Sequence, residues 1–293
     1  MGKIVRYIMT DGSAFVIATD STDVISEMEQ IHKTSATVTA ALGRLTTAAS
    51  MMGDMLKGAE DSITLRINGG GATGDLIAVS DSQGNPRAYV QNPVVEIPLN
   101  ASGKLDVSGA VGTDGQLYVI KDIGMKEPYI GQTPIISGEI AEDITNYFAT
   151  SEQTPSVCAL GVLVNPDLTV KHAGGYIIQL LPGCTDEVID VIERNVSVIP
   201  SVTEMLESGM TADDIAHEAM KGLDLDKLDE SETAYKCNCS KERVENALIS
   251  SGIDNLKEMA DSDDNTEVEC HFCNKKYIFT PSDIKALIDS ATK

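Results

Sequence analysis

Aromatic side chains are scarce in this sequence. It has no tryptophan, four phenylalanines and eight tyrosines among 293 residues. The interior must therefore be built mainly from aliphatic side chains. Hydrophobic residues make up 42% of the chain and charged residues 23%, which is ordinary for a globular protein. A chain of this length can form one large domain or two medium ones, each with its own core.

Basic residues are also in short supply. Lysine and arginine total 22 against 45 acidic residues, which gives a formal net charge of −23. Such a charge repels phosphate backbones and anionic lipids, so we expect neither a nucleic-acid partner nor a membrane partner. The N-terminus lacks the apolar stretch of a signal peptide, and no uncharged apolar run approaches the ~18 residues that span a bilayer. We therefore expect a cytoplasmic protein.

Residues that carry out catalysis are equally sparse. The four histidines, His32, His172, His217 and His271, stand at no recognised catalytic spacing. The polar run 151–153 offers no combination of nucleophile and base. The glycine-rich stretch 69–74 lies between strand patterns and lacks a following Lys-Ser/Thr pair, so it predicts a tight connection between strands rather than a phosphate-binding loop. We expect no enzymatic activity.

Residues 1–181 predict an α+β core that is mostly antiparallel sheet with packed helices. Two apolar runs separated by Asp11-Gly12 predict a β-hairpin over residues 3–18. A segment rich in Ala, Thr, Leu and Met within 23–57 predicts a helix buried against a sheet. Gly174-Gly175 suggests a β-bulge. Further strands are predicted at 62–68, 76–80, 87–91, 116–121, 157–165 and 172–181, and an amphipathic helix at 139–149.

Residues 182–235 predict a helical and acidic linker. Helices are expected at 186–194, at 201–208 with Pro200 in the first turn, and from Thr211 to about Gly222. Between Ser201 and Tyr235 there are ten acidic residues against two lysines. Helices this short are marginal and depend on the surface that they dock against, and an ordinary solvated linker fits the pattern equally well.

Residues 236–293 predict a small C-terminal domain. Helices are expected at 242–250 and 254–260, a hairpin with arms at 267–270 and 276–279, and a last helix that begins at Thr280-Pro281-Ser282-Asp283. So short a segment buries little apolar surface, so it needs a covalent or metal crosslink to fold.

Four cysteines in this last domain supply such a crosslink. They form two pairs separated by thirty residues, Cys237 with Cys239 and Cys270 with Cys273. In a reducing compartment this pattern predicts one tetrahedral Zn²⁺ per chain, held by four thiolates. His271 is not needed as a ligand, and four lysines offset the negative charge of the site: Lys236, Lys241, Lys275 and Lys276. The remaining cysteines, Cys158 and Cys184, are expected to be small buried hydrophobic residues.

The chemistry of the thiols leaves two possibilities open. A purely structural zinc site is the common outcome, and the two residues between Cys270 and Cys273 are typical of it. Zinc also keeps cysteines as thiolates, the form that oxidants attack, so the same site can be a redox switch. The single residue between Cys237 and Cys239 is compatible with both a structural zinc site and a redox switch.

The sequence resembles the family of redox-regulated chaperones known as 33-kilodalton heat-shock proteins. The CxC and CxxC pairs carry this resemblance, and so do the stretches INGGGATGDLIAVSDSQGNPRAYVQNP, KEPYIGQTPIISGEIAEDITNYFATSEQTPSVCALGVLV and AGGYIIQLLPG. It covers nearly the whole chain, and all four thiols match.

The resemblance implies an ATP-independent holdase that takes part in the response to oxidative stress. In the reduced state the four cysteines would bind zinc and the protein would be inactive. Oxidation would form disulfides Cys237–Cys239 and Cys270–Cys273, release zinc and unfold the linker. The implied partners are unfolded client proteins and, on activation, a second copy of the chain. The alternative is a regulatory or interaction protein with a purely structural zinc module of four cysteines.

Overall fold

The chain folds into two compact units, Met1–Lys236 and Cys237–Lys293. The structure is a computed structural model that describes residues 1–262 and 264–291. The predicted C-terminal domain 236–293 therefore includes residues 263 and 292–293, which lie outside the described residues. No helix in the described part of the chain is long and apolar enough to cross a membrane.

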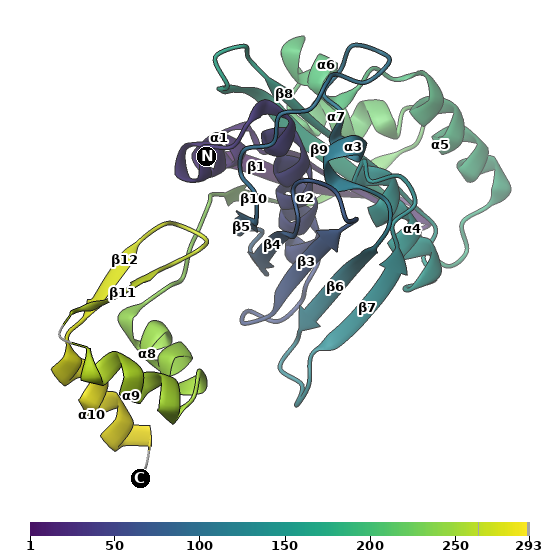
Figure 1. The fold of residues 1–293 in the computed structure, drawn as a ribbon. Coiled ribbons are helices and arrows are strands. Elements are labelled where there is room, and N and C mark those ends of the chain that lie inside the picture. Colours follow the sequence, from purple (N-terminus) through teal and green to yellow (C-terminus); the bar gives the residue numbers. More distant parts are fainter. Residues whose placement is uncertain (263, 292–293) are drawn as a thin grey trace. The chain divides into compact units, whose positions relative to one another are not determined.

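The first unit contains two antiparallel sheets of five strands each (Figure 1). The first sheet has the order β10-β1-β2-β9-β8. Its strands are β1 (Gly2–Met9), β2 (Ala14–Asp20), β8 (Ser156–Val164), β9 (Val170–Leu180) and β10 (Leu225–Thr233). The second sheet has the order β5-β4-β3-β6-β7. Its strands are β3 (Ser62–Asn68), β4 (Leu76–Asp81), β5 (Pro86–Val90), β6 (Gln116–Asp122) and β7 (Tyr129–Pro134).

Helix α2 (Ala36–Asp54) packs against strands of both sheets. Every residue of this helix except Ala36 and Arg44 is buried, as predicted from its small and aliphatic composition. Two of its hydroxyl groups are hydrogen-bonded to backbone carbonyls. Thr46 donates to the carbonyl of Leu42 at 2.7 Å, and Ser50 donates to that of Gly84 at 2.6 Å. Small side chains and satisfied hydroxyls allow close packing around the helix, which lies in the largest hydrophobic core of the chain.

Two further helices flank this core. Helix α1 (Thr22–His32) contributes Val24, Ile25 and Met28 to it, and α4 (Ala141–Thr150) contributes Ile144, Tyr147 and Phe148. Glu152 accepts a hydrogen bond from the Tyr147 hydroxyl at 2.6 Å and pairs with Lys121. The polar run 151–153 therefore supports the packing of α4.

Three helices of the predicted linker form a second apolar cluster on the first sheet. These are α5 (Asp186–Val198), α6 (Val202–Glu207) and α7 (Ala212–Ala219). The cluster joins Ile192 of α5 and Ile215 of α7 to Val5 and Tyr7 of β1 and Ile178 of β9. In this structure, residues 182–235 are therefore docked on the sheet rather than solvated. Ser201 caps α6 through the backbone N–H of Glu204, so the expectation that Pro200 lies in its first turn was wrong.

Strand β10 was not predicted from the sequence. It is acidic and mostly exposed, so it lacks the alternating apolar pattern from which strands are recognised. Strand β7 and the short helix α3 (Val107–Val111) were also missed.

The bulge expected at Gly174-Gly175 is absent. Both residues keep regular register with β2 and with β8, and the irregularity lies at Leu163/Val164 instead.

The second unit consists of three helices and a two-stranded hairpin. Helices α8 (Lys241–Ser250) and α9 (Ile253–Asp261) precede the hairpin of β11 (Thr266–Glu269) and β12 (Lys276–Phe279), and α10 (Pro281–Ala291) follows it. Thr280 accepts a hydrogen bond from the backbone N–H of Asp283 at 3.2 Å, as expected of a helix cap. These elements agree with the sequence prediction.

Gly112, which follows α3, lies against Gly69 in the glycine-rich connection between β3 and β4, and this contact gives a test of packing. Gly112 has a φ of +79°, and a Cβ there would lie 2.2 Å from the carbonyl oxygen of Gly69. We expect Gly112→Ala to lower the free energy of unfolding of the first unit by ~3 kcal/mol or more, since backbone strain and a backbone collision add. Gly103→Ala is the control, because Gly103 has a φ of +72° with nothing within 4 Å. It should lower the same quantity by only ~1 kcal/mol. Equal losses in thermal unfolding would show that the contact with Gly69 is unimportant.

Candidate metal centre

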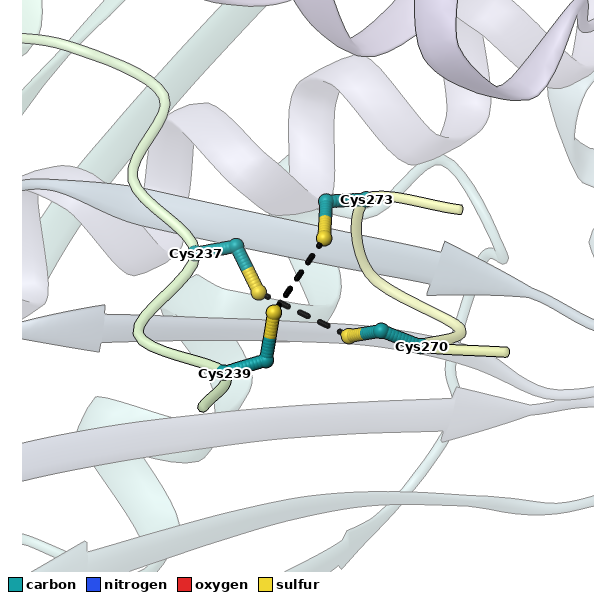
Figure 2. Close-up of side chains that lie close together, drawn as sticks. All are labelled: Cys237, Cys239, Cys270 and Cys273. Atoms are coloured by element: carbon teal, nitrogen blue, oxygen red, sulfur yellow. Dashed lines mark hydrogen bonds between the residues drawn. The ribbon is translucent and has the colours of Figure 1, made fainter. Parts of the chain in front are cut away.

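Four sulfur atoms come together in the second unit (Figure 2). The Sγ atoms of Cys237, Cys239, Cys270 and Cys273 all lie within 4.8 Å of one another. The Sγ of Cys237 lies 3.6 Å from that of Cys270, and the Sγ of Cys239 lies 3.5 Å from that of Cys273. Four sulfurs at ~2.3 Å from a central Zn²⁺ would form a tetrahedron with edges of about 3.8 Å. The donor set and its spacing therefore fit a tetrahedral metal ion.

The hairpin turn positions Cys270 and Cys273. The N–H of Cys270 donates to the carbonyl of Lys275 at 2.9 Å, and the N–H groups of Cys273 and Asn274 donate to the carbonyl of Cys270 at 3.2 and 2.8 Å. Asn274 has a φ of +56°, a left-handed conformation that asparagine tolerates well. These bonds turn the chain sharply, so that both thiols point toward the same centre.

The other pair lies just before helix α8. Residues 236–240 form neither helix nor strand, and Ser240 caps α8 by accepting a hydrogen bond from the N–H of Arg243 at 3.2 Å. Side chains two residues apart in an extended backbone share one side. One intervening residue is therefore enough for Cys237 and Cys239 to reach the same centre from one segment.

A small apolar cluster supports the four cysteines. It consists of Leu248, Leu256, Ala260, Tyr277, Phe279 and Ile284, with Cys239 and Cys270 packed against it. Tyr277 connects this cluster to the metal centre, because its hydroxyl donates to the Sγ of Cys239 at 3.1 Å. Six buried side chains are few for a unit of this size, so a metal ion bound to the four thiols would be its main crosslink.

The thiols influence one another's ionisation. For Cys239, burial disfavours the thiolate, but hydrogen bonds from Tyr277 and the neighbouring thiols favour it and lower the pKa to about 7. Burial raises the pKa of Cys237 and that of Cys273. Four thiolates this close repel one another, so they can all be ionised only around a cation.

The four lysines expected to offset this charge have other contacts as well. The ammonium of Lys275 lies 5.2 Å from the ring centre of Tyr277, and that of Lys241 lies 5.5 Å from that of Phe279. Lys276 pairs with Glu267 across the hairpin at 2.7 Å. Lys236 belongs to the first unit, where its N–H donates to the carbonyl of Pro86 at 2.9 Å. The side chains of three of these lysines thus have local contacts of their own, and Lys236 has a backbone contact in the first unit.

The other candidates from the sequence are separate from this cluster. His271 is exposed and is not among the four grouped ligands. Cys158 is buried, as expected, and its burial raises the pKa of its thiol. The burial expected for Cys184 was wrong: this residue is only half-buried, because it follows Gly183 in the turn after β9. The role of Tyr277 was missed, because the consecutive apolar residues Tyr277, Ile278 and Phe279 show no alternation in the sequence that marks which of them are buried.

Known proteins resemble this chain along nearly its whole length. A model of the Hsp33 protein family matches residues 2–280. The 33 kDa chaperonin of Clostridium acetobutylicum is 46% identical over 287 residues, which cover 98% of this chain and 97% of that protein. The 33 kDa chaperonin of Clostridium botulinum strain Alaska E43 is 45% identical and 99% of each chain is covered.

A solved structure has the same fold. The crystal structure of the 33 kDa chaperonin from Thermotoga maritima, Heat shock protein 33 homolog, superposes with a TM-score of 0.89 at 34% identity, covering 99% of this chain and 98% of that one. The α+β fold, the clustered cysteines and the similarity over the whole length agree. The chain belongs to the Hsp33 family of chaperones.

Proposed function

We propose that this protein is a redox-regulated, ATP-independent holdase that is inactive while reduced and zinc-bound. The observation that supports this most directly is the set of four sulfurs within 4.8 Å in a unit with a very small apolar core. We assign three parts to the mechanism: a chaperone core over 1–181, a linker over 182–235 and a redox-sensing domain over 236–293.

Bound Zn²⁺ would supply the positive charge that keeps all four sulfurs ionised and close together. Metal binding in small Cys-rich domains contributes roughly 10–16 kcal/mol, comparable to the whole stability of a domain. The thiolates of Cys237, Cys239, Cys270 and Cys273 are then both ligands and targets for an oxidant.

Oxidation changes what the sulfurs can bind. Two thiolates, one peroxide molecule and two protons yield one disulfide and two water molecules, so two peroxide molecules oxidise the four cysteines. We assign the disulfides to Cys237–Cys239 and Cys270–Cys273, the pairs that are neighbours in the sequence. All four sulfurs are within reach of one another. Once oxidised they no longer act as thiolate ligands, and the second unit loses its main crosslink.

Helix α5 is packed less completely than the other two linker helices. In α5 only Ile192 is buried, and Val198 is 74% exposed. A cavity of about 270 Å³ separates α5 from β8 and β9, with Ile178, Leu180, Ile189 and Ile192 in its lining. Incomplete packing reduces the free energy that holds this helix in place.

Release of residues 182–235 would bare the apolar face of the first sheet. This face carries Val5, Tyr7, Val16, Tyr176 and Ile178, and contiguous apolar surface of this kind binds unfolded polypeptides. The net charge of −23 would keep such complexes in solution. Two activated copies would associate, and the protein would act in the cytoplasm without a nucleic-acid or membrane partner.

Substitution of the cysteines tests the metal site. We expect one zinc per wild-type chain by mass spectrometry of metals, and loss of most of the zinc in Cys239→Ser, because three thiolates and a water bind zinc more weakly than four thiolates. The α8–α10 helices should unfold with it, as seen by circular dichroism or NMR. Cys184→Ser is the matched control and should retain zinc. Full zinc retention by Cys239→Ser would exclude the four-cysteine site.

Oxidation distinguishes the holdase from a protein with a purely structural zinc. We expect peroxide to release zinc, which a colorimetric zinc chelator detects. Zinc release should rise in step with the ability of the protein to protect a heat-denatured client from aggregation. Disulfide mapping by mass spectrometry should find Cys237–Cys239 and Cys270–Cys273. The structural alternative predicts zinc that is retained until peroxide damages the bulk protein. Equal protection by the reduced and oxidised forms would refute the switch.

A partly buried polar contact tests the role of linker docking. Asp213 of α7 accepts hydrogen bonds from Lys3 at 3.0 Å, Tyr7 at 2.5 Å and Lys227 at 2.7 Å. Partial burial disfavours the carboxylate, but these bonds outweigh it and hold the pKa of Asp213 well below the usual range. We expect Asp213→Asn to weaken docking by about 1 kcal/mol, allowing for solvent screening, and to lower the temperature at which the oxidised protein becomes active. Glu218→Gln is the control, since Glu218 pairs only with Lys221 next to α7 in the described contacts. Identical activation temperatures would contradict this role.

A further inference from the structure

Strand β10 occupies the outer edge of β1. The two strands pair antiparallel from Gly2↔Thr233 to Met9↔Leu225, with one irregularity at Arg6/Tyr7. Beyond β10 this sheet has no further strand in the described part of the chain. The other edge of β1 pairs with β2, and β2 in turn pairs with β9. Strand β1 would therefore stay in the sheet if β10 left it.

The backbone rather than the side chains carries most of this pairing. Along β10 only Thr233 is buried, Leu225 and Ser231 are half-buried, and the remaining side chains are exposed. Two ion pairs also join β1 to β10: Lys3 with Glu230 at 3.0 Å, and Arg6 with Asp229. Backbone pairing places few demands on sequence, because every residue except proline offers the same N–H and C=O groups.

The edge of β1 borders an apolar surface. Val5, Tyr7 and Met9 of β1 belong to the cluster that α5, α6 and α7 cover. An extended polypeptide on this edge would pair its backbone with β1 and place every second side chain over that surface. The occupant that fits is therefore an extended segment of unfolded polypeptide with apolar residues at alternate positions.

Strand β10 is protected from exchange by anchors at its C-terminal end and just beyond it. Thr233 is fully buried and donates to the carbonyl of Gly84. The hydroxyl of Tyr235 contacts both the N–H and the carbonyl of Ala88, at 3.0 and 3.1 Å. A strand tethered in this way has an effective concentration of about 1 mM or more at its own site, so a dilute competitor does not displace it.

We propose that β10 is a placeholder strand, and that in the active protein an extended segment of an unfolded client replaces it on the edge of β1. This inference rests on the proposed function, because the edge becomes free only when residues 182–235 are released. It adds a backbone-pairing site to the apolar sheet face and explains recognition that does not depend on the client's sequence.

Hydrogen exchange tests the proposal on the full chain. Amide protection is measured by mass spectrometry for the reduced protein, the oxidised protein, and the oxidised protein with reduced, carboxymethylated α-lactalbumin, an unfolded probe without thiols. We expect residues 2–9 to lose part of their protection on oxidation and to regain it with the probe. Residues 14–20 are the internal control and should stay protected throughout, since β2 lies between β1 and β9.

Two failures are distinguishable. If the oxidised protein binds the probe in size-exclusion chromatography but residues 2–9 stay unprotected, client capture uses side chains alone and the placeholder role is wrong. The same holds if residues 2–9 never lose protection. If the oxidised protein binds no probe, the proposed holdase function is wrong and this inference with it.

A peptide supplies a second measurement. The synthetic peptide of residues 224–233 should displace the probe from the oxidised protein and restore protection of residues 2–9. A control peptide with Leu228→Pro and Ser231→Pro keeps every charge but cannot pair as a strand, so it should do neither. Equal displacement by the two peptides, or none by either, would overturn the proposal.

Discussion

Four thiolates held within 4.8 Å of one another repel strongly, and only a cation at their centre makes this arrangement favourable. The second unit depends on this constraint, because its buried cluster has six members and two of the cysteines pack against it. The hydroxyl of Tyr277 extends the dependence by joining the Sγ of Cys239 to that cluster. With a metal ion bound, as we propose, the fold and the metal site would form one cooperative structure, and a chemical change at sulfur would change the stability of the unit.

The first unit shows a different balance on the two faces of its first sheet. One face packs on α2, a helix buried along almost its whole length and in contact with both sheets. The other face packs on the short helices α5, α6 and α7, with a cavity beneath α5 and polar contacts around Asp213. The incomplete packing of α5 fits the proposal that this second covering leaves without loss of the core. This asymmetry supports a mechanism in which one sheet both maintains the fold and binds clients.

Membership of the Hsp33 family and the structure contribute different parts of this account. The family identifies the protein as a chaperone. The structure adds which side chains are grouped in each unit: four thiols beside a small apolar cluster in the second, and a large core around α2 in the first. It also shows that residues 182–235 contribute both a helical covering and a strand, β10, to the same sheet. Activation by release of this segment would therefore expose an apolar face and a backbone edge together.

The sequence alone determined what depends on local pattern. It located the strands of the first hairpin, the buried helix α2, the acidic helices, the hairpin of the second unit and the four thiols, because periodicity, turn residues and ligand spacing are short-range signals. Only the tertiary structure decided the rest. Strand β10 forms because β1 offers it an edge to pair with. Strand β7 contains Gly131 and Pro134, which weaken a strand pattern in the sequence, and it forms because β6 offers it an edge. The contact between Tyr277 and Cys239 likewise depends on packing between distant segments, which no local pattern encodes.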